Sequence, residues 1–122
     1  MARILFVDDD PLTLTLLTKA AEIFGHQAIL AHSGSEAMQT AVEQSPDLIF
    51  IDRLLTDMDG LSVIRSLRAN IKTASTPLIM LSAAQELDIQ EAALSAGASA
   101  FVHKPIQLQT LQTIICQFTN ER

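Results

Sequence analysis

Short runs of apolar residues alternate along the chain with longer segments in which apolar residues recur every three or four positions. Leu48, Ile49, Phe50 and Ile51 form one such run, which follows Pro46-Asp47 and ends at Asp52. A run this short and uninterrupted predicts a strand buried on both faces of a sheet. The same pattern predicts five strands in all, over residues 3–8, 27–31, 47–52, 78–82 and 100–103.

A helical pattern follows each predicted strand. Asp10 and Pro11 suit the N-cap and the first position of the first helix, and Gly25 suits its end. Its core face is predicted from apolar residues at helical spacing: Leu12, Leu16, Leu17, Ala20 and Phe24. Ser33 and Glu36 match a capping box at the start of the second helix. The other helices are predicted over about 61–70, about 86–96 and about 108–118.

The strand-helix alternation repeats five times without a long linker or an internal repeat. Regular alternation predicts an α/β fold with a parallel sheet, right-handed crossovers and helices on both faces. Five strands with this spacing favour the flavodoxin-like, doubly wound order 2-1-3-4-5. Residues 1–122 are expected to form a single domain, because that length is close to the commonest domain size.

Polar side chains end four of the predicted strands. In the predicted order strands 1, 3, 4 and 5 lie side by side, so their carboxyl ends meet at one edge of the sheet. Open α/β sheets bind their ligands at this edge. The residues expected to converge there are Asp8, Asp9, Asp52, Ser82 and Lys104.

Composition narrows the classes of protein that the chain can represent. It is 48% hydrophobic and 18% charged, which is typical of a globular domain. Its net charge is −6 and it has no basic stripe, which argues against direct binding to nucleic acid. One cysteine excludes an intramolecular disulfide, and no apolar run is long enough to span a bilayer. We therefore expect a cytoplasmic protein without a membrane span.

The predicted cluster of Asp8, Asp9 and Asp52 has a distinctive chemistry. At about 4 Å and an effective dielectric constant of about 20, each like-charge pair costs about 4 kcal/mol, so such a cluster raises a pKa or binds a hard cation. Mg²⁺ suits it, because Mg²⁺ keeps several waters and accepts phosphate oxygens. Asp52 is a candidate nucleophile for in-line phosphoryl transfer. Lys104 would supply a positive charge, and Ser82 a hydroxyl, to the phosphoryl oxygens.

The chain also resembles a known family, the response-regulator receiver domains of two-component systems, from about Arg3 to the last helix. The resemblance rests on five segments that occur in order at receiver spacing: Val7–Asp10, Pro46–Asp52, Met58–Gly60, Pro77–Ala83 and Gly97–Pro105.

The resemblance assigns a role to each residue of the predicted site. It implies that Asp52 is the phosphoacceptor and that Mg²⁺ is held by the carboxylates of Asp8, Asp9 and Asp52 and by the backbone carbonyl of Leu54. Lys104 would contact the phosphoryl group and precede a cis proline. Ser82 and Phe101 would be the switch residues, the hydroxyl moving inward on phosphorylation and the aromatic ring rotating into the vacated space.

The resemblance further implies partners and an output face. The phosphoryl group would come from a sensor histidine kinase or a phosphotransfer protein. The surface of helix 4, strand 5 and helix 5 would then act on a downstream effector domain or protein, or form a phosphorylation-dependent homodimer. The domain would be a switch that assists its own phosphorylation and dephosphorylation.

Two departures from the family pattern stand near the predicted site. Leu55-Thr56 occupies the place of a frequent Met-Pro pair, which predicts a slightly looser loop. Leu54 and Ala84, beside the phosphorylation site by family position, cannot orient an attacking water. This predicts slow, unassisted dephosphorylation.

Two other functions use a similar set of residues or the same fold. A phosphatase of the haloacid-dehalogenase type also uses an Asp nucleophile with Mg²⁺, and Asp8-Asp9-Asp10 resembles its D-x-D motif. That family needs further acidic residues after the lysine, and only Glu121 follows Lys104. The other alternative is a binding module that has the receiver fold but no longer uses phosphate. The complete set of acids, hydroxyl and lysine argues against it.

Overall fold

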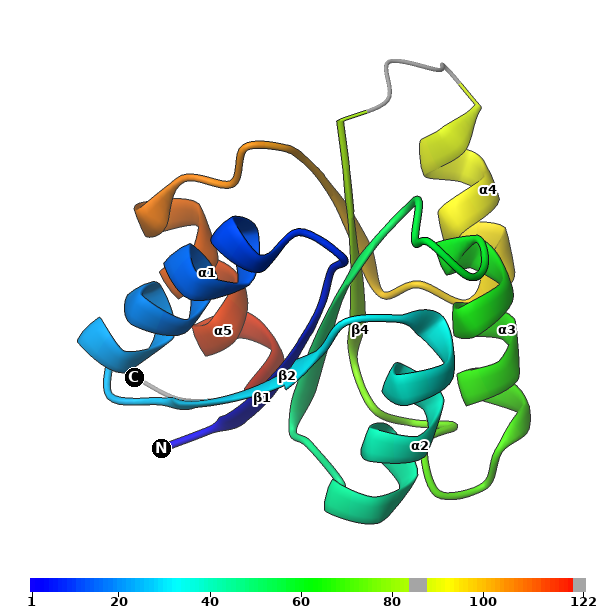
Figure 1. The fold of residues 1–122 in the computed structure, drawn as a ribbon, viewed down its shortest axis with the longest axis horizontal. Helices are drawn as coiled ribbons and strands as arrows, with labels where there is room; N and C mark the ends of the chain where they lie inside the picture. The colour runs from blue at the N-terminus through cyan, green and yellow to red at the C-terminus, as the bar shows by residue number, and fades with distance from the viewer. Residues whose placement is uncertain (84–87, 120–122) are drawn as a thin grey trace.

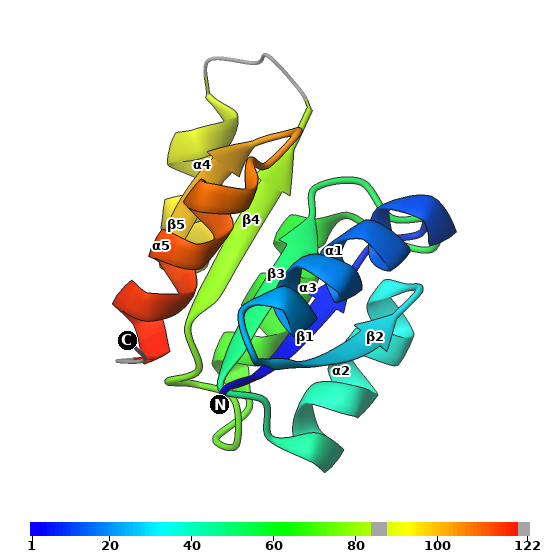
Figure 2. The ribbon, with the colours of Figure 1, turned by 90° about the vertical axis from the view of Figure 1, so that its left-hand side faces the viewer.

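The computed structural model describes residues 1–83 and 88–119. Its centre is a parallel sheet in the order β2-β1-β3-β4-β5, as predicted. Figure 2 shows the strands side by side with their carboxyl ends toward the top. The strands are β1 (Arg3–Val7), β2 (Gln27–Ala31), β3 (Leu48–Asp52), β4 (Leu78–Ser82) and β5 (Ala100–His103).

Helices cover both faces of the sheet, which makes the fold the predicted doubly wound α/β arrangement. One face carries α1 (Pro11–Ile23) and α5 (Leu108–Thr119). The other carries α2 (Gly34–Gln44), α3 (Gly60–Ala69) and α4 (Ile89–Ala96). In Figure 1 the two groups lie on the left and the right of the sheet. Residues 86–87, with which the predicted fourth helix began, lie outside the described residues.

The alternation of side chains along the strands builds two separate apolar cores. Leu5 and Ile49 point toward α2, α3 and α4, whereas Phe6 and Phe50 point toward α1 and α5. The two phenylalanine rings stack with their centroids 5.4 Å apart. Because β1, β3 and β4 are buried on both faces, they read as uninterrupted apolar runs in the sequence.

Side-chain caps begin the first two helices as predicted. The Asp10 carboxylate accepts the Leu12 N–H at 3.2 Å, and the Ser33 hydroxyl accepts the Glu36 N–H at 3.1 Å. The second half of the predicted capping box differs, because Glu36 accepts the backbone N–H of His32. These caps set where each helix begins after its strand end.

The predicted core face of α1 was wrong in part. Leu14, Leu17 and Ala21 face the sheet, while Leu12 and Leu16 are 65% and 61% exposed. The helix has apolar residues on more than one side, so helical spacing alone could not identify the buried stripe. The outer surface of α1 consequently carries exposed apolar side chains among its polar ones. Within the described part of the chain, the helices are too short or too polar to cross a membrane.

Candidate functional site

The strand ends bring the predicted polar residues together at one edge of the sheet. Asp8 directly follows β1, Asp52 is the last residue of β3, and Lys104 directly follows β5. Parallel pairing aligns these ends, since Val7 is in register with Ile51 and Asp52 with Leu81. The convergence that the sequence predicted is therefore present.

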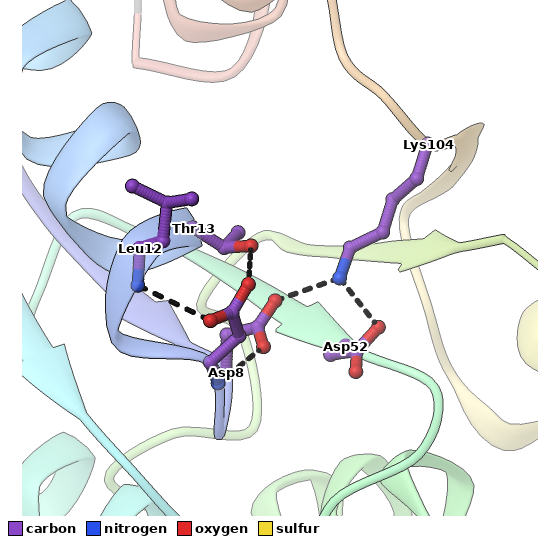
Figure 3. Close-up of polar contacts among 6 residues, drawn as sticks. Asp8, Leu12, Thr13, Asp52 and Lys104 are labelled. Carbon is purple, nitrogen blue, oxygen red and sulfur yellow. Dashed lines mark hydrogen bonds and ion pairs between the residues drawn. The ribbon is translucent and has the colours of Figure 1, made fainter.

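Lys104 connects two of the carboxylates. Its Nζ atom lies 2.7 Å from Asp8 Oδ2 and 3.0 Å from Asp52 Oδ1. Figure 3 shows the ammonium group between the two acids, reaching in from the segment after β5. Asp8 is almost completely buried and Asp52 is partly buried, so these ion pairs are shielded from bulk water.

Asp8, Asp9 and Asp52 form a set of carboxylates suited to a metal ion. Each offers an oxygen, and these oxygens lie within 4.8 Å of one another. Three carboxylates with room for water are the donor set of a hard cation such as Mg²⁺. The donor atoms present therefore fit Mg²⁺, the cation that the sequence analysis predicted.

Burial and neighbouring charges shift the pKa values of Asp52 and Lys104. Burial raises the pKa of Asp52 above its ordinary value, and the negative charge of Asp8 raises it further, although Lys104 acts in the opposite direction. Burial alone would lower the pKa of Lys104, but its bonds to Asp8 and Asp52 outweigh this effect and raise it. An additional cation beside Asp52 would stabilise its ionised form and lower its pKa.

Asp10 belongs to the helix rather than to the metal cluster. Its carboxylate accepts hydrogen bonds from the Thr13 hydroxyl at 2.7 Å and from the Leu12 N–H at 3.2 Å. These bonds lower the pKa of Asp10, the one from Thr13 having the largest effect. The Asp10 N–H in turn donates to Asp8 Oδ1 at 3.0 Å and so helps to orient Asp8.

The loop after β3 is closed on itself. The Gly60 N–H donates to the carbonyl of Arg53 at 2.7 Å, and Arg53 Nη1 lies 3.0 Å from Asp59 Oδ2. An isolated bridge pairs Leu54 with Asp59. A Cβ atom at Gly60 would lie 2.3 Å from the backbone carbonyl oxygen of Asp52, so only glycine allows this close approach. The loop thus fixes the backbone at Leu54 beside the carboxylates.

Two further side chains tie this loop to its neighbours, and sequence reasoning missed both roles. Asp57 accepts the N–H groups of Gly34 and Ser35 at the start of α2, at 2.8 and 3.0 Å. These bonds lower the pKa of Asp57. The Thr56 hydroxyl donates to Asp9 Oδ2 at 2.9 Å. No local sequence signal marks such bonds, because the partners lie 22 to 47 residues away. The looser loop expected from Leu55-Thr56 stays a prediction, and these contacts argue against it.

The two predicted switch residues lie on neighbouring strands. Ser82 is buried at the end of β4, and its carbonyl accepts the Lys104 N–H at 2.9 Å. Phe101 on β5 is partly buried against the core under α4, and its ring meets His103 edge-on at 5.1 Å. The Lys104-Pro105 peptide bond is cis, as predicted. Ala84 lies outside the described residues.

An apolar pocket of about 350 Å³ lies beside the carboxylate site, between α1 and the segment after β5. It is lined by Thr13, Leu16, Leu17, Leu81, Ala83, Lys104, Pro105 and Ile106. Together with the exposed side chains of Leu12 and Leu54, it gives the site an apolar border.

Comparison with known proteins places this fold and site in a family. The family model described as response regulator receiver domain matches residues 4–116. Protein PilH of Pseudomonas aeruginosa is 30% identical over 111 residues, which cover 91% of this chain and 92% of PilH. The transcriptional regulatory protein PrrA of Mycobacterium tuberculosis is 37% identical over 109 residues, which cover 89% of this chain but 46% of PrrA. The chain thus spans about half the length of such regulators.

Solved structures agree with the family match. The receiver domain of sensor histidine kinase PA1611 from Pseudomonas aeruginosa, which has a magnesium ion coordinated in its active-site cleft, is 29% identical with a TM-score of 0.90 over 98% of both chains. A receiver domain protein of Clostridium thermocellum is 26% identical with a TM-score of 0.90, over 98% of this chain and 95% of the other. Because the family match includes every strand end described above, the chain belongs to the response regulator receiver domains, the phosphoacceptor switches of two-component signal transduction.

Proposed function

We propose that Asp52 accepts a phosphoryl group from a phosphohistidine on a sensor histidine kinase or a phosphotransfer protein. The observation that carries this proposal is the single ammonium group of Lys104, bonded at once to Asp8 and to Asp52 inside a carboxylate cluster. Such a group can exchange one carboxylate for a phosphoryl oxygen without leaving its place.

Different residues of the site would bind the metal ion, attack the phosphorus atom and bind the phosphoryl oxygens. Asp8, Asp9 and Asp52, with the backbone carbonyl of Leu54, would hold Mg²⁺, which when bound supplies positive charge beside the phosphoryl oxygens. A carboxylate oxygen of Asp52 attacks phosphorus in line and forms a P–O bond. The P–N bond of the donor breaks, and the imidazole nitrogen keeps the electron pair. Lys104 and the Ser82 hydroxyl then bind the phosphoryl oxygens.

The readout follows from the positions of two residues. Movement of the Ser82 hydroxyl toward the phosphoryl group opens space beside β4, and the Phe101 ring on β5 rotates into it. This shifts the equilibrium between inactive and active conformations of the surface formed by α4, β5 and α5 toward the active one. An effector domain or protein, or a second copy of the chain, reads this surface.

The phosphodonor is proposed to cover the apolar border of the site. Leu12 and Leu16 on α1 and Leu54 in the loop after β3 are 61% to 65% exposed. Apolar side chains around a charged site give a partner contact area that excludes water during the transfer.

Residues 1–122 are proposed to act as one receiver domain in the cytoplasm, where phosphohistidine donors and effectors meet.

The aspartyl phosphate is expected to be long-lived. Leu54 is exposed beside the site but has no polar group with which to orient an attacking water. Replacing it by Leu54→Asn should shorten the lifetime of the acyl phosphate, followed by the loss of phosphorylated mass over time. An unchanged lifetime in this variant would show that position 54 does not limit hydrolysis.

The proposal is tested with a small phosphodonor such as acetyl phosphate. Folded protein is incubated with the donor and Mg²⁺, and the intact mass is measured for wild type, Asp52→Asn and a matched control, Asp88→Asn. Asp88 is exposed and makes no side-chain cap bond. One phosphoryl adduct on wild type and the control, absent from Asp52→Asn and from samples with EDTA, is expected. Folded wild type without an adduct would point instead to a binding module that does not use phosphate.

A further inference from the structure

One hydrogen bond joins the two loops that carry the carboxylates and the Leu54 carbonyl. The Thr56 hydroxyl, in the loop after β3, donates to Asp9 Oδ2, in the loop after β1, at 2.9 Å. The two residues are 47 positions apart in the sequence. Asp9 is also the most exposed of the three clustered acids, so fewer neighbours hold its carboxylate in place.

We propose that Thr56 is a positioning residue that holds the Asp9 carboxylate ready to bind a divalent cation. This inference rests on the proposed function, because it concerns the Mg²⁺ site of that function. Asp9 lies close to the negative charges of Asp8 and Asp52, which repel its carboxylate toward solvent. The bond from Thr56 opposes this repulsion and leaves the second oxygen of Asp9 available to a metal. Groups that orient a ligand in this way raise metal affinity by preorganising the site.

The position of the Thr56 hydroxyl is itself fixed. The next residue, Asp57, binds the first N–H groups of α2, and the Arg53–Asp59 ion pair closes the loop on its other side. Threonine also has few side-chain rotamers, because it is branched at Cβ. An anchored loop with a stiff side chain can aim one hydroxyl at Asp9. A proline, the residue frequent at this place in the family, has no hydroxyl with which to do so.

The test measures Mg²⁺ binding directly, without phosphorylation. Isothermal titration calorimetry is suitable, because the chain has no Trp or Tyr for fluorescence. Thr56→Val removes the hydroxyl at nearly constant shape, and Thr56→Ser keeps it. Thr15→Val is the matched control, because among the described residues the exposed Thr15 hydroxyl bonds only within α1, to the carbonyl of Pro11.

Thr56→Val should bind Mg²⁺ about 3- to 10-fold more weakly than wild type, at the low end of the losses seen for groups that orient metal ligands. Thr56→Ser and Thr15→Val should bind like wild type. In EDTA, Thr56→Val should keep a Tm close to that of Thr15→Val, because the role concerns the cation and not the fold. In excess Mg²⁺, its Tm should rise less than that of wild type.

Three results would overturn the inference. Wild-type affinity in Thr56→Val would show that the bond does not serve the cation. An equal loss in Thr56→Ser would show that the hydroxyl is not the group responsible. Absence of Mg²⁺ binding by wild type itself would overturn the proposed metal site as well. The first two results leave the phosphoacceptor proposal intact, so the two failures can be told apart.

Discussion

Two half-buried cations lie at opposite ends of the sheet, and their partners differ in kind. At the carboxyl ends of the strands, Lys104 bonds to the ionised acids Asp8 and Asp52. At the other end, Arg68 on α3 makes hydrogen bonds only to neutral groups among the described residues: the carbonyls of Thr73, Ala74, Thr76 and Gly97 and the hydroxyl of Ser99.

The difference separates a cation bonded only to neutral groups from one to which we assign a role in phosphoryl transfer. Four carbonyls and one hydroxyl accept hydrogen bonds from the Arg68 guanidinium, which thereby joins the segment before β4 to the turn before β5. Burial lowers the pKa of Arg68, whereas the carboxylates raise the pKa of Lys104. Arg68 therefore stabilises loops. Lys104 pairs with two acids that repel one another and places a positive charge where a phosphoryl group is proposed to bind.

Loss of the lysine should produce the largest effect. Lys104→Met removes the charge proposed to bind a phosphoryl oxygen, so phosphorylation of Asp52 by acetyl phosphate should slow by about 100-fold. The rate is measured by intact mass against time in saturating Mg²⁺. Arg68→Met, taken at a temperature at which it is folded, should stay within about 2-fold of wild type. Similar losses in the two variants would contradict the comparison.

Loss of Arg68 should have a large effect on the free energy of unfolding. Arg68→Met leaves partly buried carbonyls without their charged donor, so the free energy of unfolding should fall by about 2 kcal/mol. The exposed residue Arg65 on the same helix provides the control, and Arg65→Met should change stability by less than about 0.5 kcal/mol. Urea unfolding followed by circular dichroism measures both. A loss in Arg65→Met as large as that in Arg68→Met would remove the structural role assigned to Arg68.

Ionised Asp52, beside Lys104, should lower the free energy of unfolding rather than raise it. Because burial raises the pKa of Asp52, its ionised form is disfavoured in the folded state. This cost is present above the raised pKa and disappears as pH falls below the unfolded value of about 3.9. Asp52→Asn should therefore be about 1 kcal/mol more stable at pH 7 in EDTA, and the gain should vanish in acid. A destabilised Asp52→Asn at pH 7 would mean that the Lys104 ion pair outweighs the burial cost.

The smallest effect is expected at Asp57, an acid whose partners are neutral like those of Arg68. Backbone N–H groups of α2 lower its pKa, so its contribution to stability is present above the unfolded value and is lost as pH falls through the folded one. Asp57→Asn should lower the Tm slightly at pH 7, and the difference from wild type should shrink in acid. A difference that grew as pH fell would contradict the assigned sign of the pKa shift.

The sequence by itself determined the order of the strands in the sheet and which polar residues lie together at its carboxyl edge. Strands buried on both faces must be short uninterrupted apolar runs, and each polar residue that ends such a run lies at a strand end. The order 2-1-3-4-5 then places Asp8, Asp52 and Lys104 at one edge. These inferences held because they depend on local patterns and on one topological rule.

Only the tertiary structure decided how those parts are held. Helical spacing did not show that Leu14, rather than Leu12 or Leu16, faces the sheet, because apolar residues occur on several sides of α1. The bonds from Thr56 to Asp9 and from Arg68 to Gly97 join residues 47 and 29 positions apart. Such contacts have no periodic signature, since they depend on where folded loops meet. The residues of the carboxylate–lysine cluster were therefore visible in the sequence, whereas the residues that contact and orient them became visible only in the fold.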